Sequence, residues 1–214
     1  MKNSKFILMA SFATLFFTSC YTNSLVQSAK TLNPLQAAVN VAFESNQSQL
    51  QNKVVSLPHF GVRMGVLNGL ELQTRSNLSS YVDMGAKFRL AGENSIYQSA
   101  MGLNLGVIRV PNTFRTEESE NSEILITEKL IYVPVYLSKS IFNFTIFGGS
   151  KLGYAIEAKE AYLTANLGLA YKLPNTKHHV FVEGYNIQSP KSLNATFENH
   201  NRLGFTIGVS LNAF

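Results

Sequence analysis

The feature that most constrains this chain is a period of two in side-chain character, which runs from residue 36 almost to the C-terminus. In the first segment Ala37, Val39 and Phe43 share one parity, while Asn40 and Glu44 share the other. Successive side chains of a β-strand point to opposite faces, so this alternation predicts strands with one apolar and one polar face. Helical spacing is almost absent, and we expect an all-β domain.

The alternation recurs in about ten segments of roughly ten residues each, a number and a length that suit tilted strands crossing an outer membrane. Pro134 weakens one segment as a central strand. We expect residues 36–214 to form a closed antiparallel up-and-down transmembrane β-barrel of about ten strands, or else about eight or twelve. The expected strands cover 36–44, 59–66, 70–75, 81–90, 97–107, 130–139, 143–154, 163–170, 179–187 and 202–212.

The connections between these segments alternate in length, as periplasmic turns and outer loops of a barrel do. The joints near residues 68, 92, 140 and 175 are short, and Leu67-Asn68-Gly69 is a tight hairpin signal. The long joints cover 46–53, 111–126 and 188–199, with 76–79 as a short exception on the outer side. Both ends of the barrel are therefore expected in the periplasm.

The polar parity carries glycine, asparagine and charges of both signs, whereas the apolar parity keeps long side chains on strand after strand. This mixture indicates that the polar side chains line a narrow lumen and do not form the solvent-exposed face of a soluble β-sandwich. We expect a ladder of opposite charges that fills and stabilises the lumen, with a small anion-selective conduit as the alternative. Bulk porin activity is not expected from so few strands. The ladder comprises His59, Arg63, Glu71, Arg75, Asp83, Lys87 and Arg89.

Aromatic residues near the expected strand ends suit the girdles that flank the apolar band of a membrane barrel. They are Phe88, Tyr97, Tyr132, Tyr154, Tyr162, Tyr171 and Tyr185.

The N-terminus has the layout of a signal peptide over residues 1–19, with a basic head, an apolar run and small residues before Cys20. The apolar run is roughly a dozen residues, short of the ~20 that a helix needs to span a bilayer. Residues 17–20 resemble a bacterial lipobox, although Phe17 replaces the usual leucine. The resemblance implies that Cys20 is lipidated and anchors the chain, the alternative being an ordinary signal with a coincidental cysteine. Residues 20–35 are then the lipidated N-terminus and a polar tether.

Two stretches resemble small Gram-negative outer-membrane β-barrel proteins. They are Gly61–Val66 with the following Leu70–Leu72, and Leu203–Leu211 with the terminal Phe214. The resemblance implies contact with outer-membrane lipid and lipopolysaccharide, and it implies that Phe214 is the signal for the outer-membrane assembly machinery. Phe214 has the opposite parity from the outward residues before it, so either a bulge intervenes or the signal is imperfect. The resemblance is to an architecture and implies no activity.

No pattern of catalytic or ligand-binding residues stands out. The formal charge of +5 comes without any Lys/Arg-rich run, which argues against nucleic acid. Asp83 is the single aspartate, so an omptin-like protease site is excluded, and no G-x-S-x-G motif is present. His59, His178, His179 and His200 fit no metal pattern, since neighbouring residues of a strand point to opposite faces. We expect no enzyme, cofactor or metal.

An acidic stretch lies between residues 117 and 128, and we expect it to be a solvated outer loop because its spacing matches no calcium loop. Its acidic residues are Glu117, Glu118, Glu120, Glu123 and Glu128.

Three functions fit these observations. The first is a structural or interaction barrel, such as a subunit of an envelope complex. The second is a narrow transporter for small anionic or hydrophobic solutes. The third is a soluble lipocalin-like lipoprotein, whose apolar parity would face inward. The third function requires the apolar side chains to point into the barrel, whereas the first two require them to point outward. The residues that decide this are Val62, Met64, Leu103, Leu105, Phe205 and Ile207.

Overall fold

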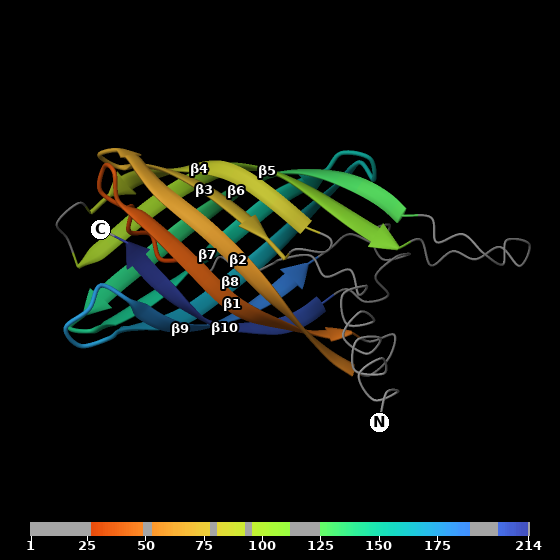
Figure 1. The fold of residues 1–214 in the computed structure, drawn as a ribbon. Coiled ribbons are helices and arrows are strands. Elements are labelled where there is room, and N and C mark those ends of the chain that lie inside the picture. Colours follow the sequence, from red (N-terminus) through yellow and green to blue (C-terminus); the bar gives the residue numbers. More distant parts are fainter. Residues whose placement is uncertain are drawn as a thin grey trace, which may run out of the picture.

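All ten predicted segments are strands in the computed structural model, which describes residues 27–48, 53–77, 81–92, 96–111, 125–188 and 201–213 (Figure 1). The strands are β1 Ala37–Ser48, β2 Lys53–Leu67, β3 Leu70–Ser76, β4 Tyr81–Ala91, β5 Tyr97–Pro111, β6 Leu125–Ile141, β7 Phe144–Ala155, β8 Glu160–Lys172, β9 His179–Gln188 and β10 Asn201–Ala213. Within the described residues, no helix has the length and apolar character needed to cross a membrane.

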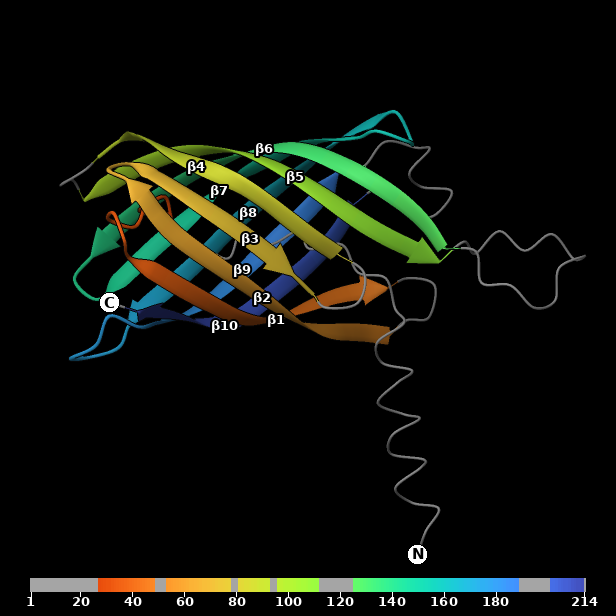
Figure 2. The same ribbon diagram turned by 45° about the horizontal axis from the view of Figure 1, so that its top comes forward.

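The strands form one closed antiparallel barrel in which each strand pairs with its neighbours in the sequence (Figure 2). Strand β1 closes the ring by pairing with β10, in a register that runs from Ala37 opposite Ala213 to Asn46 opposite Gly204. Closure leaves no free sheet edge, so every strand has hydrogen-bonding partners on both sides. The predicted up-and-down barrel of ten strands is confirmed.

The apolar parity faces outward. The exposed fractions are 48% for Val62, 55% for Leu105 and 56% for Ile207, and each of the ten strands carries such exposed apolar side chains. The opposite parity points into the lumen and holds mainly polar and aromatic side chains. This distribution is the reverse of what a soluble ligand-binding barrel needs, so the lipocalin-like alternative is wrong.

Short turns join the strands at one end of the barrel, where β1 also begins and β10 ends (Figure 1). The turn between β2 and β3 contains Asn68 and Gly69, and Gly69 has a φ of 82°. Glycine adopts this left-handed conformation without a steric penalty, which explains the hairpin signal. We call this the short-turn end.

Pro134 lies inside β6, where its ring is buried on the lumen side. The pairing of β5 with β6 skips the two positions between Met101 and Asn104, at and next to this proline. A Cβ on Gly102 would lie 2.9 Å from the Pro134 Cγ, so the missing side chain at Gly102 makes room for the ring. The interrupted ladder explains how a central strand accepts a residue that lacks an N–H donor.

Candidate functional site

Six of the seven predicted ladder residues are buried in the lumen, on β2, β3 and β4. Glu71 and Lys87 stand opposite each other in the register of β3 and β4, and their charged groups are 3.1 Å apart. The Arg63 Nη1 lies 3.4 Å from the same Glu71 oxygen. Glu71 and Lys87 have no exposed surface. One carboxylate therefore serves two cations, and the cluster carries a net positive charge.

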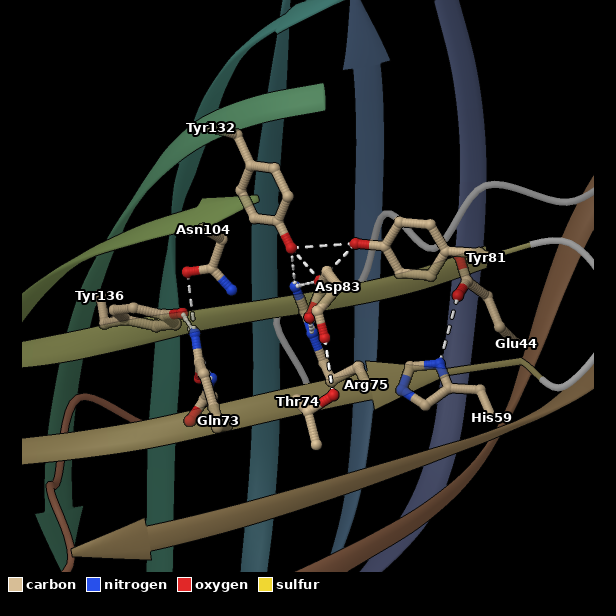
Figure 3. Close-up of polar contacts among 11 residues, drawn as sticks. Glu44, His59, Gln73, Thr74, Arg75, Tyr81, Asp83, Asn104, Tyr132 and Tyr136 are labelled. Carbon is tan, nitrogen blue, oxygen red and sulfur yellow. Dashed lines mark hydrogen bonds and ion pairs between the residues drawn. The ribbon is translucent and has the colours of Figure 1, made fainter. Parts of the chain in front are cut away.

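A second cluster is centred on Asp83 (Figure 3). Arg75 is directly opposite Asp83, and its Nη2 and Nε lie 2.5 Å and 3.1 Å from the Asp83 Oδ2. The hydroxyls of Tyr81 and Tyr132 both donate to the same carboxylate. Arg75 also donates to the Tyr132 hydroxyl at 2.6 Å. Burying this ion pair removes its hydration, and these additional hydrogen bonds offset that cost.

Further polar contacts extend around the lumen wall. The His59 Nδ1 lies 3.6 Å from the Glu44 carboxylate of β1 (Figure 3). Gln73 donates to the Asn104 side-chain oxygen at 3.0 Å and to the Tyr136 hydroxyl at 3.3 Å. These contacts join β1 to β2, and β3 to β5 and β6, so polar side chains of neighbouring strands bind one another inside the lumen.

Arg89 is the one predicted ladder residue outside this buried set. It is half-buried at the short-turn end, where its Nη2 donates to the Asn68 side chain at 3.0 Å. Its backbone N–H donates to the Gly69 carbonyl at 2.8 Å. Arg89 shares the inward parity of Lys87, but it lies at the end of β4 and therefore contacts the β2–β3 turn.

A short segment before β1 enters the lumen, which the sequence interpretation as a tether over 20–35 did not foresee. We call residues 27–33 the luminal segment. The Lys87 Nζ donates to the Gln27 side-chain oxygen at 2.9 Å and to the backbone carbonyl of Lys30 at 3.1 Å. The Glu71 Oε2 accepts the backbone N–H of Leu32 at 2.9 Å. Buried charges need partners, and the polar backbone of this segment supplies them.

Gly65 makes the space through which the luminal segment passes. A Cβ at this position would lie 2.0 Å from the carbonyl oxygen of Asn33. The Gly65 backbone also bonds the chain just before β1, because its carbonyl accepts the N–H of Leu35 and its N–H donates to the Gln36 carbonyl, both at 2.9 Å. The segment is thus fixed at the short-turn end and reaches inward from it.

Three of the residues predicted to form membrane girdles are inside the barrel instead. Tyr132, Tyr162 and Tyr185 have exposed fractions of 0%, 6% and 3%. Tyr162 is directly opposite Gly153, and Tyr185 is directly opposite Gly204. A Cβ added to Gly153 would lie 2.0 Å from the Tyr162 ring, and one added to Gly204 would lie 2.2 Å from the Tyr185 ring. The tyrosines share the inward parity, and the glycines give their rings room. Cross-strand Gly–Tyr pairing was the sequence signal that was missed.

Sequence reasoning also missed several lumen residues because their strands had no regular charge pattern. Lys151 is fully buried, and its Nζ lies 5.1 Å from the centre of the Tyr132 ring. Glu183 is fully buried and accepts a hydrogen bond of 2.7 Å from the Asn166 side chain. The parity of the strands was the available signal.

The predicted anchoring and assembly residues lie outside the described part of the chain. Lipidation of Cys20 and the assembly role of Phe214 stay predictions, as does the solvated loop at Glu117, Glu118, Glu120 and Glu123. His200 and the proposed signal peptide 1–19 also lie outside the described residues.

Glu128 does not belong to a solvated loop. It is a buried residue of β6 whose carboxylate accepts the backbone N–H groups of Glu157 and Ala158 at 2.8 Å and 3.1 Å. It therefore caps the turn between β7 and β8. In the part of the chain that the structure describes, no three His, Cys, Asp or Glu side chains gather as metal ligands.

The sequence matches no family model and no curated protein. Among solved structures, the chain is similar to a KdgM porin, with 14% identity, a TM-score of 0.43, and coverage of 83% of this chain and 99% of that one. It is also similar to a NanC porin, with 12% identity, a TM-score of 0.42, and coverage of 82% and 98%. The N-terminal β-barrel domain of Pseudomonas aeruginosa OprF gives 7% identity, a TM-score of 0.40, and coverage of 85% and 100%. The fold assignment rests on the strand pairing itself.

Proposed function

We propose that the protein is an outer-membrane β-barrel with a closed lumen, and that it has a structural or interaction role in the cell envelope. The closed lumen carries this proposal. The Glu71–Lys87 cluster and the Asp83 cluster fill the interior with buried groups, and the luminal segment contacts the first of them through Gln27. A barrel filled in this way presents its outer surface and its loops to partners rather than a pore to solutes.

The outward face of β6 supports the membrane location. Lys129 and Lys139 are its outward lysines in the described residues, and the outward positions between them hold Ile131, Val133, Val135 and Leu137. Ten residues span about 33 Å along a strand, or about 25 Å along the normal at a usual barrel tilt, which matches the apolar band of such barrels. The Lys139 Nζ lies 4.8 Å from the centre of the exposed Tyr97 ring, an arrangement that suits a membrane interface.

The partners in this proposal follow from the location. Outer-membrane lipid and lipopolysaccharide would contact the apolar belt, and the outer-membrane assembly machinery would insert the barrel. A second envelope protein would bind the loops or the rim. The proposal includes no catalytic role.

A second candidate is a narrow conduit for small anions. The observation in its favour is a local excess of cations around Glu71, whose single carboxylate pairs with both Arg63 and Lys87. Displacing the luminal segment would be necessary for such a conduit, because the segment binds Lys87 and Glu71 directly.

Planar-bilayer recording of the full-length protein tests the proposal. We expect heat-modifiable migration on gels, as for a folded barrel, together with no discrete conductance steps in chloride salts. Stable steps in the unmodified protein would contradict the closed-lumen proposal. Steps with a reversal potential that favours anions would support the conduit instead.

A further inference from the structure

A cavity of about 430 Å³ lies at the short-turn end, between the luminal segment and the walls of β6 to β10. Its ionisable side chains are all basic, and no Asp or Glu of the described residues lines it. The basic side chains come from five separate parts of the chain, which are the luminal segment, β2, β8, the β8–β9 turn and β9. The basic residues are Lys30, Arg63, Lys172, Lys177 and His179.

The positive charge of this cavity is not neutralised locally. Lys30, Lys172 and Lys177 form no ion pair with any carboxylate in the described ranges. Arg63 shares Glu71 with Lys87, so it does not have a carboxylate to itself. Several like charges that converge in a partly enclosed space attract anions strongly, because the low-dielectric walls reduce screening by water.

Arg63 adds a buried positive charge to this cavity. The residue is 8% exposed and its side chain 10% exposed, and its Nη1 is held by Gln27 and Glu71. A guanidinium fixed in this way keeps its charge beside the cavity, where it attracts an anion through space. Arg63 lies at the inner end of the cavity, next to Gln27 of the luminal segment.

The uncharged lining indicates the size and chemistry of the ligand. The amide side chains of Asn33, Asn143 and Asn212 can hydrogen-bond it, and Phe147 and Phe181 give an apolar surface on one side. The volume falls in the range of sites for small molecules, which is about 300 to 1,000 Å³. The barrel wall separates this space from the outer surface, so the ligand would come from the aqueous phase rather than from the bilayer.

We propose that this cavity is a binding site for a small soluble anion that carries carboxylate or phosphate groups. Lys172, Lys177 and Lys30 bind its charges at the mouth, and the Arg63 guanidinium attracts it towards the inner end. This inference goes beyond the proposed envelope role, and it holds whether or not the barrel conducts.

Calorimetric titration of the full-length protein with citrate, in an uncharged detergent, tests the site. We expect saturable binding of one citrate per barrel and no binding of glucose. The double substitution Lys172→Gln with Lys177→Gln removes two charges at the mouth, and we expect it to weaken citrate binding about tenfold or more. Heat-modifiable migration shows whether each variant folds.

Lys139→Gln is the matched control, because it removes a lysine at the same end of the barrel but on the outer face. We expect it to leave citrate binding unchanged. If the double variant fails to fold, the exposed Lys30→Gln gives the same comparison with a several-fold loss expected. Absence of saturable binding, or an equal loss in Lys139→Gln, would overturn the proposal. Conductance plays no part in this readout, so its outcome is separate from that of the closed-lumen proposal.

Discussion

At the scale of single residues, Asp83 is a buried charge that three other side chains bind. Its carboxylate binds Arg75 and accepts hydrogen bonds from the hydroxyls of Tyr81 and Tyr132. These four residues come from three strands, β3, β4 and β6. The carboxylate therefore joins strands that are distant in the sequence, and its loss should affect the barrel as a whole.

Asp83→Asn should destabilise the barrel strongly. The substitution leaves a buried Arg75 guanidinium without its counter-charge, a change that typically costs about 3 to 5 kcal/mol of unfolding free energy. The protein has no tryptophan, so urea unfolding in detergent is followed by circular dichroism and by heat-modifiable migration.

Two comparisons make this result specific. The double variant Arg75→Gln with Asp83→Asn should recover part of the loss, because no unpaired charge remains. Lys129→Gln should change the unfolding free energy by about 1 kcal/mol or less, since its ion pair with Glu157 is exposed. A double variant less stable than Asp83→Asn alone would show that the cost does not come from the unpaired guanidinium.

At the scale of the elements, the packing of adjacent strands depends on glycines that face large aromatic rings. Gly153 lies opposite Tyr162 on β8, and a Cβ there would lie 2.0 Å from the ring. The ring belongs to the same buried cluster as Tyr81 and Tyr132, which bind Asp83. We therefore expect a displacement of the ring to disturb the packing around the Asp83 cluster.

Gly153→Ala should therefore lower the unfolding free energy by about 1 to 3 kcal/mol, the usual cost of overpacking a dense interior. Gly184→Ala is the control, because a Cβ there would meet only two backbone oxygens, at 4.0 Å. We expect that control to stay within about 0.5 kcal/mol of the unmodified protein. Equal effects of the two substitutions in urea unfolding would contradict the role assigned to the Gly–Tyr pair.

At the scale of the whole molecule, the closed-lumen proposal depends on the luminal segment. It forms hydrogen bonds with the buried side chains of Arg63, Glu71 and Lys87. The fold of the wall depends instead on the backbone pairing of ten strands. Removing the segment should thus change the lumen more than the wall.

A variant that lacks residues 27–33 should keep heat-modifiable migration and show small conductance steps in a planar bilayer. The exposed lumen would then have more cations than carboxylates around Glu71, so the steps should favour anions. Gly65→Ala offers a less drastic change, because its Cβ would collide with the Asn33 carbonyl and displace the segment. Silent bilayers with both variants would mean that the side-chain clusters alone close the lumen.

The sequence alone predicted the strand positions and most of the ladder. These properties are local, because the alternation of side chains along a strand reports directly on its two surroundings. The sequence favoured a closed barrel with its apolar face outward but left an inward-facing alternative open, and the structure excluded that alternative. Only the tertiary structure decided which lumen groups meet. Asp83 and Tyr132 are far apart in the sequence, and their contact depends on the register of several strands around a closed ring. Tyr162 lies inside the barrel because the closed ring leaves room for its ring there. Residues 27–33 lie in the lumen because the charges of Glu71 and Lys87, which the closed barrel buries, need hydrogen-bond partners.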